Sequence, residues 1–285
     1  MTSVENLGGG CVLFKNAIHV PQDTIIPLLE ELKHTAREKM FTIVYDEAGK
    51  PTHALNQGGF IYDLEKIEKA PVRIMNLSHE FFHDCEDAIY AALLQYIELF
   101  PAILQSLWWK SEGHLLAYDV GGRLGFHCDN DVNYRYGALP PTEHATRNVV
   151  SALVYLNDCV DPGEEETPYS YSGGHMSIPY FDIDIKPKTG DILLFPANYL
   201  GAHEIFEVTR GTRYSYLSWF AQGSDHEDKG ISPQHEKTGK VIGGQYWLKT
   251  IIEDYENYIV NKYPEAALRP QHLLAMTGRP KDHVK

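Results

Sequence analysis

Apolar residues recur at intervals of three and four positions in three segments of the chain, residues 21–39, 78–100 and 245–262. Side chains at this spacing lie on one face of an α-helix. The sequence therefore predicts two amphipathic helices ahead of the central region and one behind it. The residues that carry the pattern are Ile25, Ile26, Leu29, Leu32, Phe82, Cys85, Ile89, Leu93, Tyr96, Trp247, Ile251, Tyr255 and Ile259.

The central region consists of shorter segments that are typical of β-strands. Residues 192–196 are a continuous apolar run, while residues 123–129, 202–208 and 212–220 mix apolar and polar positions. Glycine and proline punctuate the segments between them, as in the turn at residues 187–191. Short runs bounded by such residues predict strands joined by turns.

Two of these predicted strands carry residues that could bind a metal ion. His127 and Asp129 are two positions apart, so on a strand they project to the same side, while Cys128 faces away. His203 lies on the strand at residues 202–208, and we expect that strand to lie beside the one that carries Arg213. Two imidazoles and one carboxylate are the ligand set that holds a redox-active ferrous ion with open coordination positions. An isolated His-x-Asp also occurs as a polar pair at a surface strand end.

Arg213 is the first of four residues that lie on one face of the predicted strand at residues 212–220, because side chains alternate along a strand. The other three are Ser215, Leu217 and Trp219. If this face lines a barrel interior, the guanidinium can make two parallel hydrogen bonds to a carboxylate and the Ser215 hydroxyl can donate a third. The alternative is a salt bridge at the rim. The position of Arg213, ten residues after His203, favours the carboxylate receptor.

The order of these residues resembles the prolyl-4-hydroxylase-type catalytic domain of the iron- and 2-oxoglutarate-dependent dioxygenase superfamily. The resemblance covers about residues 110–222. It rests on Tyr118, Gly121, His127, Asp129, Tyr155, Leu156, Asn157, Gly173, Gly174, Pro187, Gly190, Asp191, Leu193, Phe195, His203, Val208, Gly211, Arg213 and Trp219.

The resemblance implies a fold that is mainly β with flanking helices, built on a double-stranded β-helix, or jelly roll, of the cupin-like kind. It implies that His127, Asp129 and His203 bind catalytic Fe(II). It also implies that Arg213 and Ser215 bind 2-oxoglutarate. Tyr118 is expected to face this co-substrate, or else to serve as a core aromatic.

The implied activity is that of a 2-oxoglutarate-dependent dioxygenase that uses Fe(II) and O2, with ascorbate as a stimulant. Halogenating members carry a small residue in place of the ligand carboxylate, whereas this chain keeps Asp129. Hydroxylation of an unactivated C–H bond is therefore favoured, with desaturation, cyclisation or epoxidation as alternatives. A metal cupin that does not use 2-oxoglutarate, or a ligand-binding jelly roll, is the alternative from another class.

We predict one domain over residues 1–285 with three parts. Residues 1–110 would form a largely helical support, residues 110–222 the β-helix core, and residues 223–285 a loop and a helix packed on the core. At 285 residues and 43% hydrophobic content, the chain is long enough to bury a sizeable core.

Composition excludes several partners. A formal net charge of −14 argues against binding to a nucleic-acid backbone. No stretch has the ~20 apolar residues of a membrane span, and the first residues lack the pattern of a secretion signal. The four cysteines are scattered rather than paired as in zinc sites. These features predict a cytoplasmic protein with reduced thiols.

The substrate is expected to be a small molecule, such as an amino acid or a biosynthetic natural-product intermediate, with a protein or peptide side chain as the alternative. The insertion after Asp129 is long and polar, and such loops often bind substrate. The candidate substrate contacts are Arg123, Tyr134, Arg135 and Trp219. The histidines that compete as metal ligands are His114, His144, His175 and His226, of which His175 is the strongest rival.

Overall fold

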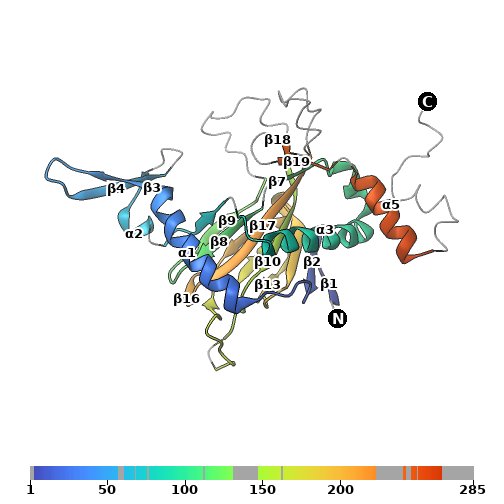
Figure 1. Ribbon diagram of the computed structural model, residues 1–285, viewed down its shortest axis with the longest axis horizontal. Helices are drawn as coiled ribbons and strands as arrows, with labels where there is room; N and C mark the ends of the chain where they lie inside the picture. Colours follow the sequence, from blue (N-terminus) through green and yellow to red (C-terminus); the bar gives the residue numbers. More distant parts are fainter. Residues whose placement is uncertain are drawn as a thin grey trace.

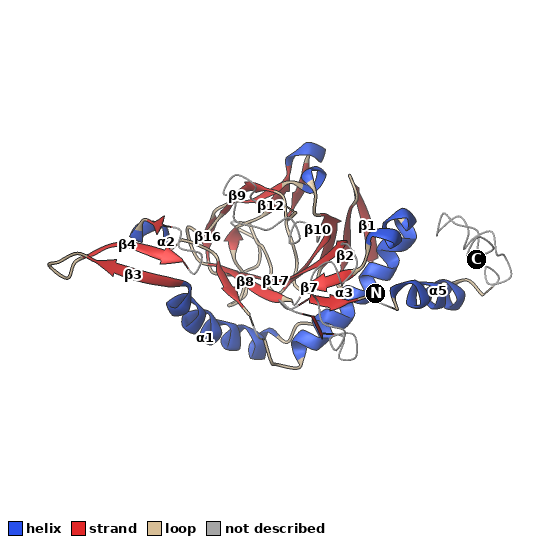
Figure 2. Ribbon diagram, turned by 90° about the horizontal axis from the view of Figure 1, so that it is seen from above, coloured by secondary structure: helices blue, strands red, loops and turns tan. Residues whose placement is uncertain are grey.

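Two antiparallel β-sheets face each other at the centre of the chain (Figures 1 and 2). They are seen in a computed structural model whose described residues fall in ten ranges. These are residues 3–56, 61–67, 69–75, 77–111, 113–130, 147–161, 163–222, 240–241, 245–248 and 250–264.

The larger sheet has ten strands in its described part. Its centre runs in the order β1-β2-β14-β10-β17, and β17 then pairs with β8 along its first half and with β7 near its end. β6 extends the sheet beyond β8, and β19 and β18 extend it beyond β7. The bounds are β1 Ser3–Gly8, β2 Cys11–Lys15, β6 Val72–Ile74, β7 Trp109–Ser111, β8 His114–Tyr118, β10 Arg147–Tyr155, β14 Ile192–Pro196, β17 Arg213–Gln222, β18 Lys240–Val241 and β19 Gln245–Trp247.

The smaller sheet has four strands in the order β13-β12-β15-β9, and a separate pair joins β11 to β16. A buried apolar layer lies between the large and small sheets, with Leu153 and Phe195 from the large sheet and Met176 and Ile205 from the small one. Two antiparallel sheets packed over one core confirm the predicted double-stranded β-helix. The bounds are β9 Leu124–His127, β11 Ser172–Gly173, β12 Met176–Ile178, β13 Ile183–Ile185, β15 His203–Ile205 and β16 Val208–Arg210.

Helices cover the outer face of the large sheet (Figure 2). The two N-terminal helices are present close to their predicted bounds, as α1 Gln22–Met40 and α3 Phe81–Leu99. Tyr214, Tyr216 and Phe220 of β17 join the apolar cluster beneath them, while Leu217 belongs to the cluster between the sheets. The alternation predicted for residues 213–219 is therefore confirmed.

The C-terminal helix begins later than predicted. Residues 245–247 form β19, and the helix is α5 Ile251–Lys262, which packs Ile251, Tyr255 and Ile259 into the same outer cluster. β19 pairs with β7 at the side of the sheet. An edge strand leaves backbone donors and acceptors unpaired, and their pairing overrides the local helical pattern.

The first 110 residues contribute strands as well as helices. β1, β2 and β6 belong to the large sheet. A separate sheet of β3 Phe41–Tyr45, β4 Pro51–Asn56 and β5 Ile61–Tyr62 extends away from the barrel beyond α1 (Figure 1). The remaining short helices are α2 Leu64–Ile67, η1 Pro101–Ser106, η4 Pro179–Phe181 and η5 Tyr199–Gly201.

None of the helices in the described part of the chain has both the length and the apolar character needed to cross a membrane. None of the four cysteines, all of which the structure describes, takes part in a disulfide bond.

Candidate active site

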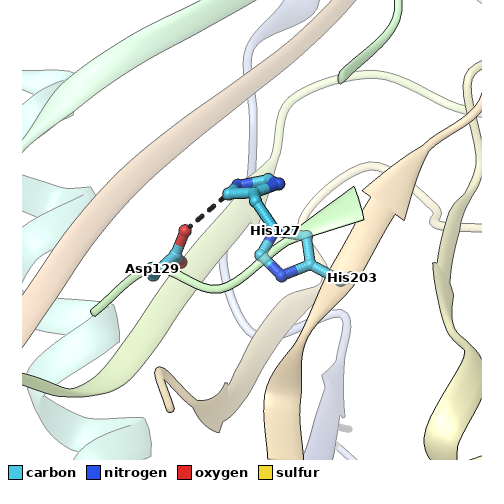
Figure 3. A group of neighbouring side chains, drawn as sticks. All are labelled: His127, Asp129 and His203. Atoms are coloured by element: carbon cyan, nitrogen blue, oxygen red, sulfur yellow. Dashed lines mark ion pairs between the residues drawn. The ribbon is translucent and has the colours of Figure 1, made fainter. Parts of the chain in front are cut away.

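His127, Asp129 and His203 converge inside the barrel (Figure 3). His127 is the last residue of β9 and His203 is the first residue of β15, and the two are cross-strand partners. One ligand atom from each of the three side chains lies within 4.8 Å of the other two. Three residues from distant parts of the sequence thus form one group that could hold a metal ion.

Two details of the predicted placement are wrong. β9 ends at His127, so Asp129 lies in the following turn rather than on the strand. Asn148 Nδ2 donates to the backbone oxygen of Asp129 at 2.8 Å and fixes this turn. In addition, β15 and β17 lie in different sheets, so His203 and Arg213 come from the two opposite sheets and not from adjacent strands. The intervening β16 lets the chain cross between the sheets.

Both imidazoles are oriented by the backbone two residues before them. Nδ1 of His127 lies 2.8 Å from the carbonyl oxygen of Gly125, and Nδ1 of His203 lies 3.0 Å from that of Gly201. A carbonyl can only accept, so each Nδ1 carries the proton and each Nε2 presents a lone pair. Burial lowers the pKa of His203 below its usual value, which favours the neutral form that binds metals.

The carboxylate of Asp129 is held at one oxygen and presented at the other. Oδ2 accepts hydrogen bonds from Ser151 Oγ at 2.5 Å and from Trp219 Nε1 at 3.1 Å. Oδ1 lies 3.4 Å from Nε2 of His127. Burial acts to raise the pKa of Asp129, but its polar surroundings, which include the hydrogen bonds from Ser151 and Trp219, lower it to about 2. The carboxylate is therefore ionised at neutral pH.

The donor set fits a ferrous ion. Two neutral imidazoles and one ionised carboxylate, with the carboxylate bound through one oxygen, are the protein ligands of non-haem Fe(II) oxygenases. Groups that orient the ligands in this way raise metal affinity and fix geometry.

Arg213 is buried on the same interior face, with 1% of its surface exposed. Nη1 donates to Ser215 Oγ at 3.3 Å, whereas Nε and Nη2 have no hydrogen-bond partner among the described residues. The guanidinium carbon lies 5.1 Å from the ring centre of Tyr118 and 5.6 Å from that of Tyr155. A buried guanidinium with two unsatisfied donors is costly unless an anion binds there. The site therefore suits the carboxylate of a ligand.

Two of the sequence motifs build the surroundings of Arg213. Asn157 donates to the backbone oxygens of Tyr169 and Thr212 and accepts from the backbone of Tyr214, which fixes the start of β17. Gly174 has a φ of +61°, and a Cβ there would lie 2.7 Å from Val208 and 3.3 Å from Arg213. Only glycine permits this backbone conformation so close to the guanidinium.

The other candidate residues are placed as follows. Arg123 is exposed just before β9, and Tyr134 and Arg135 lie outside the described residues, as do His144 and His226. His175 stacks on Phe206 with ring centres 4.3 Å apart and does not belong to the metal group. Cys128 donates to Asn130 Oδ1 at 3.5 Å and likewise lies outside that group.

Sequence reasoning missed Ser151. It is fully buried in the apolar strand β10, where its cross-strand partner is Trp219. A single hydroxyl among apolar neighbours, at the alternating positions shared with Leu153 and Tyr155, was the available signal. The hydrogen bond to Asp129 explains why a polar residue occupies this position.

Comparison with known proteins identifies the central region. Residues 113–221 match the family model described as the 2OG-Fe(II) oxygenase superfamily. These residues form a 2OG-Fe(II) oxygenase domain. The match confirms the predicted superfamily for residues 113–221 and assigns this domain to the 2-oxoglutarate-dependent iron dioxygenase class. The cofactors of this class are Fe(II), 2-oxoglutarate and O2, as predicted; a stimulating effect of ascorbate stays a prediction.

Three curated relatives are described as PKHD-type hydroxylases. A PKHD-type hydroxylase of Xylella fastidiosa (strain M12) is 24% identical over 204 residues, which cover 71% of this chain and 77% of the relative. PKHD-type hydroxylases of Hyphomonas neptunium and Acinetobacter baylyi are 34% and 30% identical over 104 residues. These two matches cover 36% of this chain and 39% of each relative.

Solved structures similar to the chain include two prolyl hydroxylases. The viral collagen prolyl hydroxylase from Paramecium Bursaria Chlorella virus-1 aligns with a TM-score of 0.46 and 13% identity, over 75% of this chain and 96% of that one. A Pseudomonas putida prolyl-4-hydroxylase aligns with a TM-score of 0.41 and 20% identity, over 75% and 94%.

Proposed function

We propose that the oxygenase domain hydroxylates an unactivated C–H bond of a small molecule, with His127, Asp129 and His203 as iron ligands. Arg213, Ser215 and Tyr118 receive the 2-oxoglutarate. One observation carries this assignment. A buried guanidinium with two unsatisfied donors lies in the same barrel interior as a His-Asp-His group that could hold a metal ion.

Bound Fe(II), 2-oxoglutarate and O2 supply an oxidation in which 2-oxoglutarate is converted to succinate and CO2 while one oxygen atom enters the substrate. The residues of the chain hold and orient these components. The backbone contacts of His127 and His203 keep both Nε2 lone pairs directed at the metal position. Ser151 and Trp219 donate hydrogen bonds to Oδ2 of Asp129, so Oδ1 is the carboxylate oxygen that would bind the metal. A carboxylate that binds through one oxygen occupies one coordination position and leaves others open for 2-oxoglutarate and O2.

The proposed 2-oxoglutarate contacts follow from the chemistry around Arg213. The guanidinium would make a bidentate contact with the distal carboxylate, and the Ser215 hydroxyl would donate to the same group. Tyr118 pairs with Arg213 across the strands and is 1% exposed, so its ring forms a wall of the receptor. Enclosure by apolar residues of the two sheets keeps water from the reacting groups.

Hydroxylation is favoured over other oxidations by two observations. The metal carboxylate Asp129 is present and held in place, which disfavours halogenation. The relatives from Xylella, Hyphomonas and Acinetobacter are all described as hydroxylases.

A small-molecule substrate is supported by the polar, aromatic-rich loops that flank the metal motif in the sequence. The second candidate is a protein or peptide side chain, supported by the resemblance of the motif set to the prolyl-4-hydroxylase type. A metal cupin or ligand-binding jelly roll is the weaker alternative, because neither needs a buried carboxylate receptor beside the metal group.

The test measures binding and turnover separately. In calorimetric titrations, Mn(II) and 2-oxoglutarate should each tighten the binding of the other in the wild-type protein. Arg213→Met should abolish this mutual enhancement, and Arg210→Met, which removes a half-buried arginine paired with Glu166, should retain it. A wild-type protein without mutual enhancement contradicts the proposal. Succinate release with Fe(II) in air, screened with amino acids, metabolites and peptides, then decides between the two substrate classes.

A further inference from the structure

Arg73 places a positive charge on the wall that leads to the metal group. It lies at the centre of β6, which pairs with β8 at the margin of the large sheet. Its neighbours Val72 and Ile74 are buried in the cluster beneath the helices. Because side chains alternate along a strand, Arg73 projects to the opposite face, the face that lines the barrel interior. Its cross-strand partner there is Leu116, which packs against the interior cluster.

A continuous row of contacts connects Arg73 with Asp129. Its guanidinium carbon lies 5.6 Å from the ring centre of Trp219, and Nη2 lies 3.5 Å from Nδ1 of His114. The rings of His114 and Trp219 are 5.0 Å apart. Trp219 in turn donates its indole hydrogen to Asp129. The side chain of Trp219 thus lies between an exposed cation and a proposed iron ligand.

The row combines an aromatic surface with a cation at its outer end. Trp219 is half-buried, His114 is buried, and Arg73 is exposed, so Arg73 is the member of the row that is most open to solvent. The formal net charge of the chain is −14, so the positive charge of Arg73 is opposite in sign to the net charge of the protein. An aromatic ring with an adjacent guanidinium suits a ligand with a compact apolar body and an anionic group.

We propose that Arg73 is a specificity-determining residue that binds a carboxylate of the substrate, with the C–H to be oxidised lying along Trp219. This inference rests on the proposed function, because it takes the His-Asp-His group as the oxidising centre. A carboxylate is preferred to a phosphate because one guanidinium fork matches one carboxylate, whereas phosphate sites usually gather several donors. The site selects an acid-bearing small molecule over an uncharged internal peptide segment.

Arg73 and Arg213 have separate tasks. Arg213 is buried among Tyr118 and Tyr155, whereas Arg73 is exposed at the sheet margin beside His114 and Trp219. With 2-oxoglutarate at saturation, the Arg213 receptor is filled and a second carboxylate has to use another cation. This separation allows the two sites to be tested independently.

The experiment compares an acid with its amide. N-acetyl-L-prolinamide has a neutral carboxamide of similar shape where N-acetyl-L-proline has a carboxylate. The affinities of the two are measured by NMR line broadening with Mn(II) in place of Fe(II) and 2-oxoglutarate at saturation. The wild-type protein should bind the acid about fivefold to tenfold more tightly than the amide. Arg73→Gln should remove this preference, and Arg73→Lys should keep part of it. Arg210→Met, which also removes one positive charge, should leave it unchanged.

Three results would overturn the assignment. The wild-type protein could bind the acid and the amide with equal affinity, or Arg73→Gln could keep the preference for the acid. The third result is that Arg210→Met loses the preference as fully as Arg73→Gln does. An Arg73-dependent preference for O-phospho-L-serine over N-acetyl-L-proline would replace the carboxylate with a phosphate. Circular dichroism and thermal unfolding confirm that each variant is folded.

Failure of the proposed function is recognised separately. In that case Mn(II) and 2-oxoglutarate would not tighten the binding of each other. This measurement does not involve Arg73. Saturation-transfer NMR without added metal measures the same acid and amide pair, so the preference due to Arg73 is tested whether or not the metal site forms. If the wild-type protein shows mutual enhancement but binds the acid and the amide equally, the Arg73 inference alone is contradicted.

Discussion

Ser151 Oγ lies 2.5 Å from Oδ2 of Asp129 and donates a hydrogen bond to it. The serine comes from the centre of the large sheet and the aspartate from the turn after β9 in the small sheet. This contact therefore joins the two sheets at the candidate metal group. It also leaves Oδ1 as the oxygen that faces His127.

Removing this hydrogen bond should weaken the metal site without unfolding the protein. We expect Ser151→Ala to lower Mn(II) affinity by about tenfold, because groups that orient metal ligands typically contribute ~10–100-fold. Calorimetric titration measures the change. Ser218→Ala removes another buried serine hydroxyl, one that donates to the backbone of Ser111, and serves as the control. Equal losses in the two variants would mean that the effect is general destabilisation.

The metal ligands themselves should be indispensable for turnover. Asp129→Ala and His203→Ala each delete one of three donors, so we expect succinate release to fall to background and metal binding to be lost. His175→Ala, which removes a histidine stacked on Phe206 outside the group, should keep metal binding. Iron content after reconstitution and succinate assays provide the readout, and substantial turnover in Asp129→Ala would exclude that residue as a ligand.

Loss of the buried guanidinium should act on 2-oxoglutarate rather than on the metal. We expect Arg213→Ala to raise the 2-oxoglutarate requirement by about a hundredfold, since a charge-assisted contact contributes ~1.5–3 kcal/mol. Mn(II) binding in the absence of 2-oxoglutarate should be nearly unchanged. In thermal unfolding, 2-oxoglutarate with Mn(II) should raise the Tm of the wild-type protein but not that of the variant. Near-normal 2-oxoglutarate affinity in Arg213→Ala would refute the receptor.

The C-terminal helix should be released by one substitution on α3. Glu98 accepts hydrogen bonds from Tyr258 and Tyr263 and pairs with Lys262 at 2.6 Å, which ties α5 to α3. Glu98→Ala should lower the free energy of unfolding by ~1 kcal/mol, because the group is half-buried and solvent screens part of its interaction. Limited proteolysis should then cut near α5 earlier than in the wild-type protein. An unchanged proteolysis pattern would show that apolar packing of α5 suffices.

This contact should also make the helix sensitive to acid. Burial acts to raise the pKa of Glu98, but hydrogen bonds from Lys262, Tyr263 and Tyr258 lower it below its usual value of 4.5. A carboxylate with a lowered pKa stabilises the folded state above its unfolded pKa, and this stabilisation is lost as the pH falls below 4.5 through the lowered value. Stability curves of the wild-type protein and Glu98→Ala should therefore converge in that range.

Residue chemistry and short-range periodicity were enough to predict much of the molecule. The apolar faces of α1 and α3 and the alternation along β17 follow from helix and strand geometry, which depends on neighbours a few positions away. The donor set could also be predicted, because few side chains bind Fe(II) and the spacing of His127, Asp129, His203 and Arg213 is specific. The group forms in the structure, and its role in binding iron stays a prediction.

Tertiary structure alone decided how these pieces pair. Hydrogen bonds between strands join residues far apart in sequence, so nothing local specified that β15 would pair with β9 while β17 joined the opposite sheet. The same holds for β19, which pairs with β7 although its sequence pattern is helical. Ser151 and Arg73 acquire their positions beside Asp129 and Trp219 only through this pairing. Periodicity determines the face on which a side chain lies, and strand pairing determines which side chains that face meets.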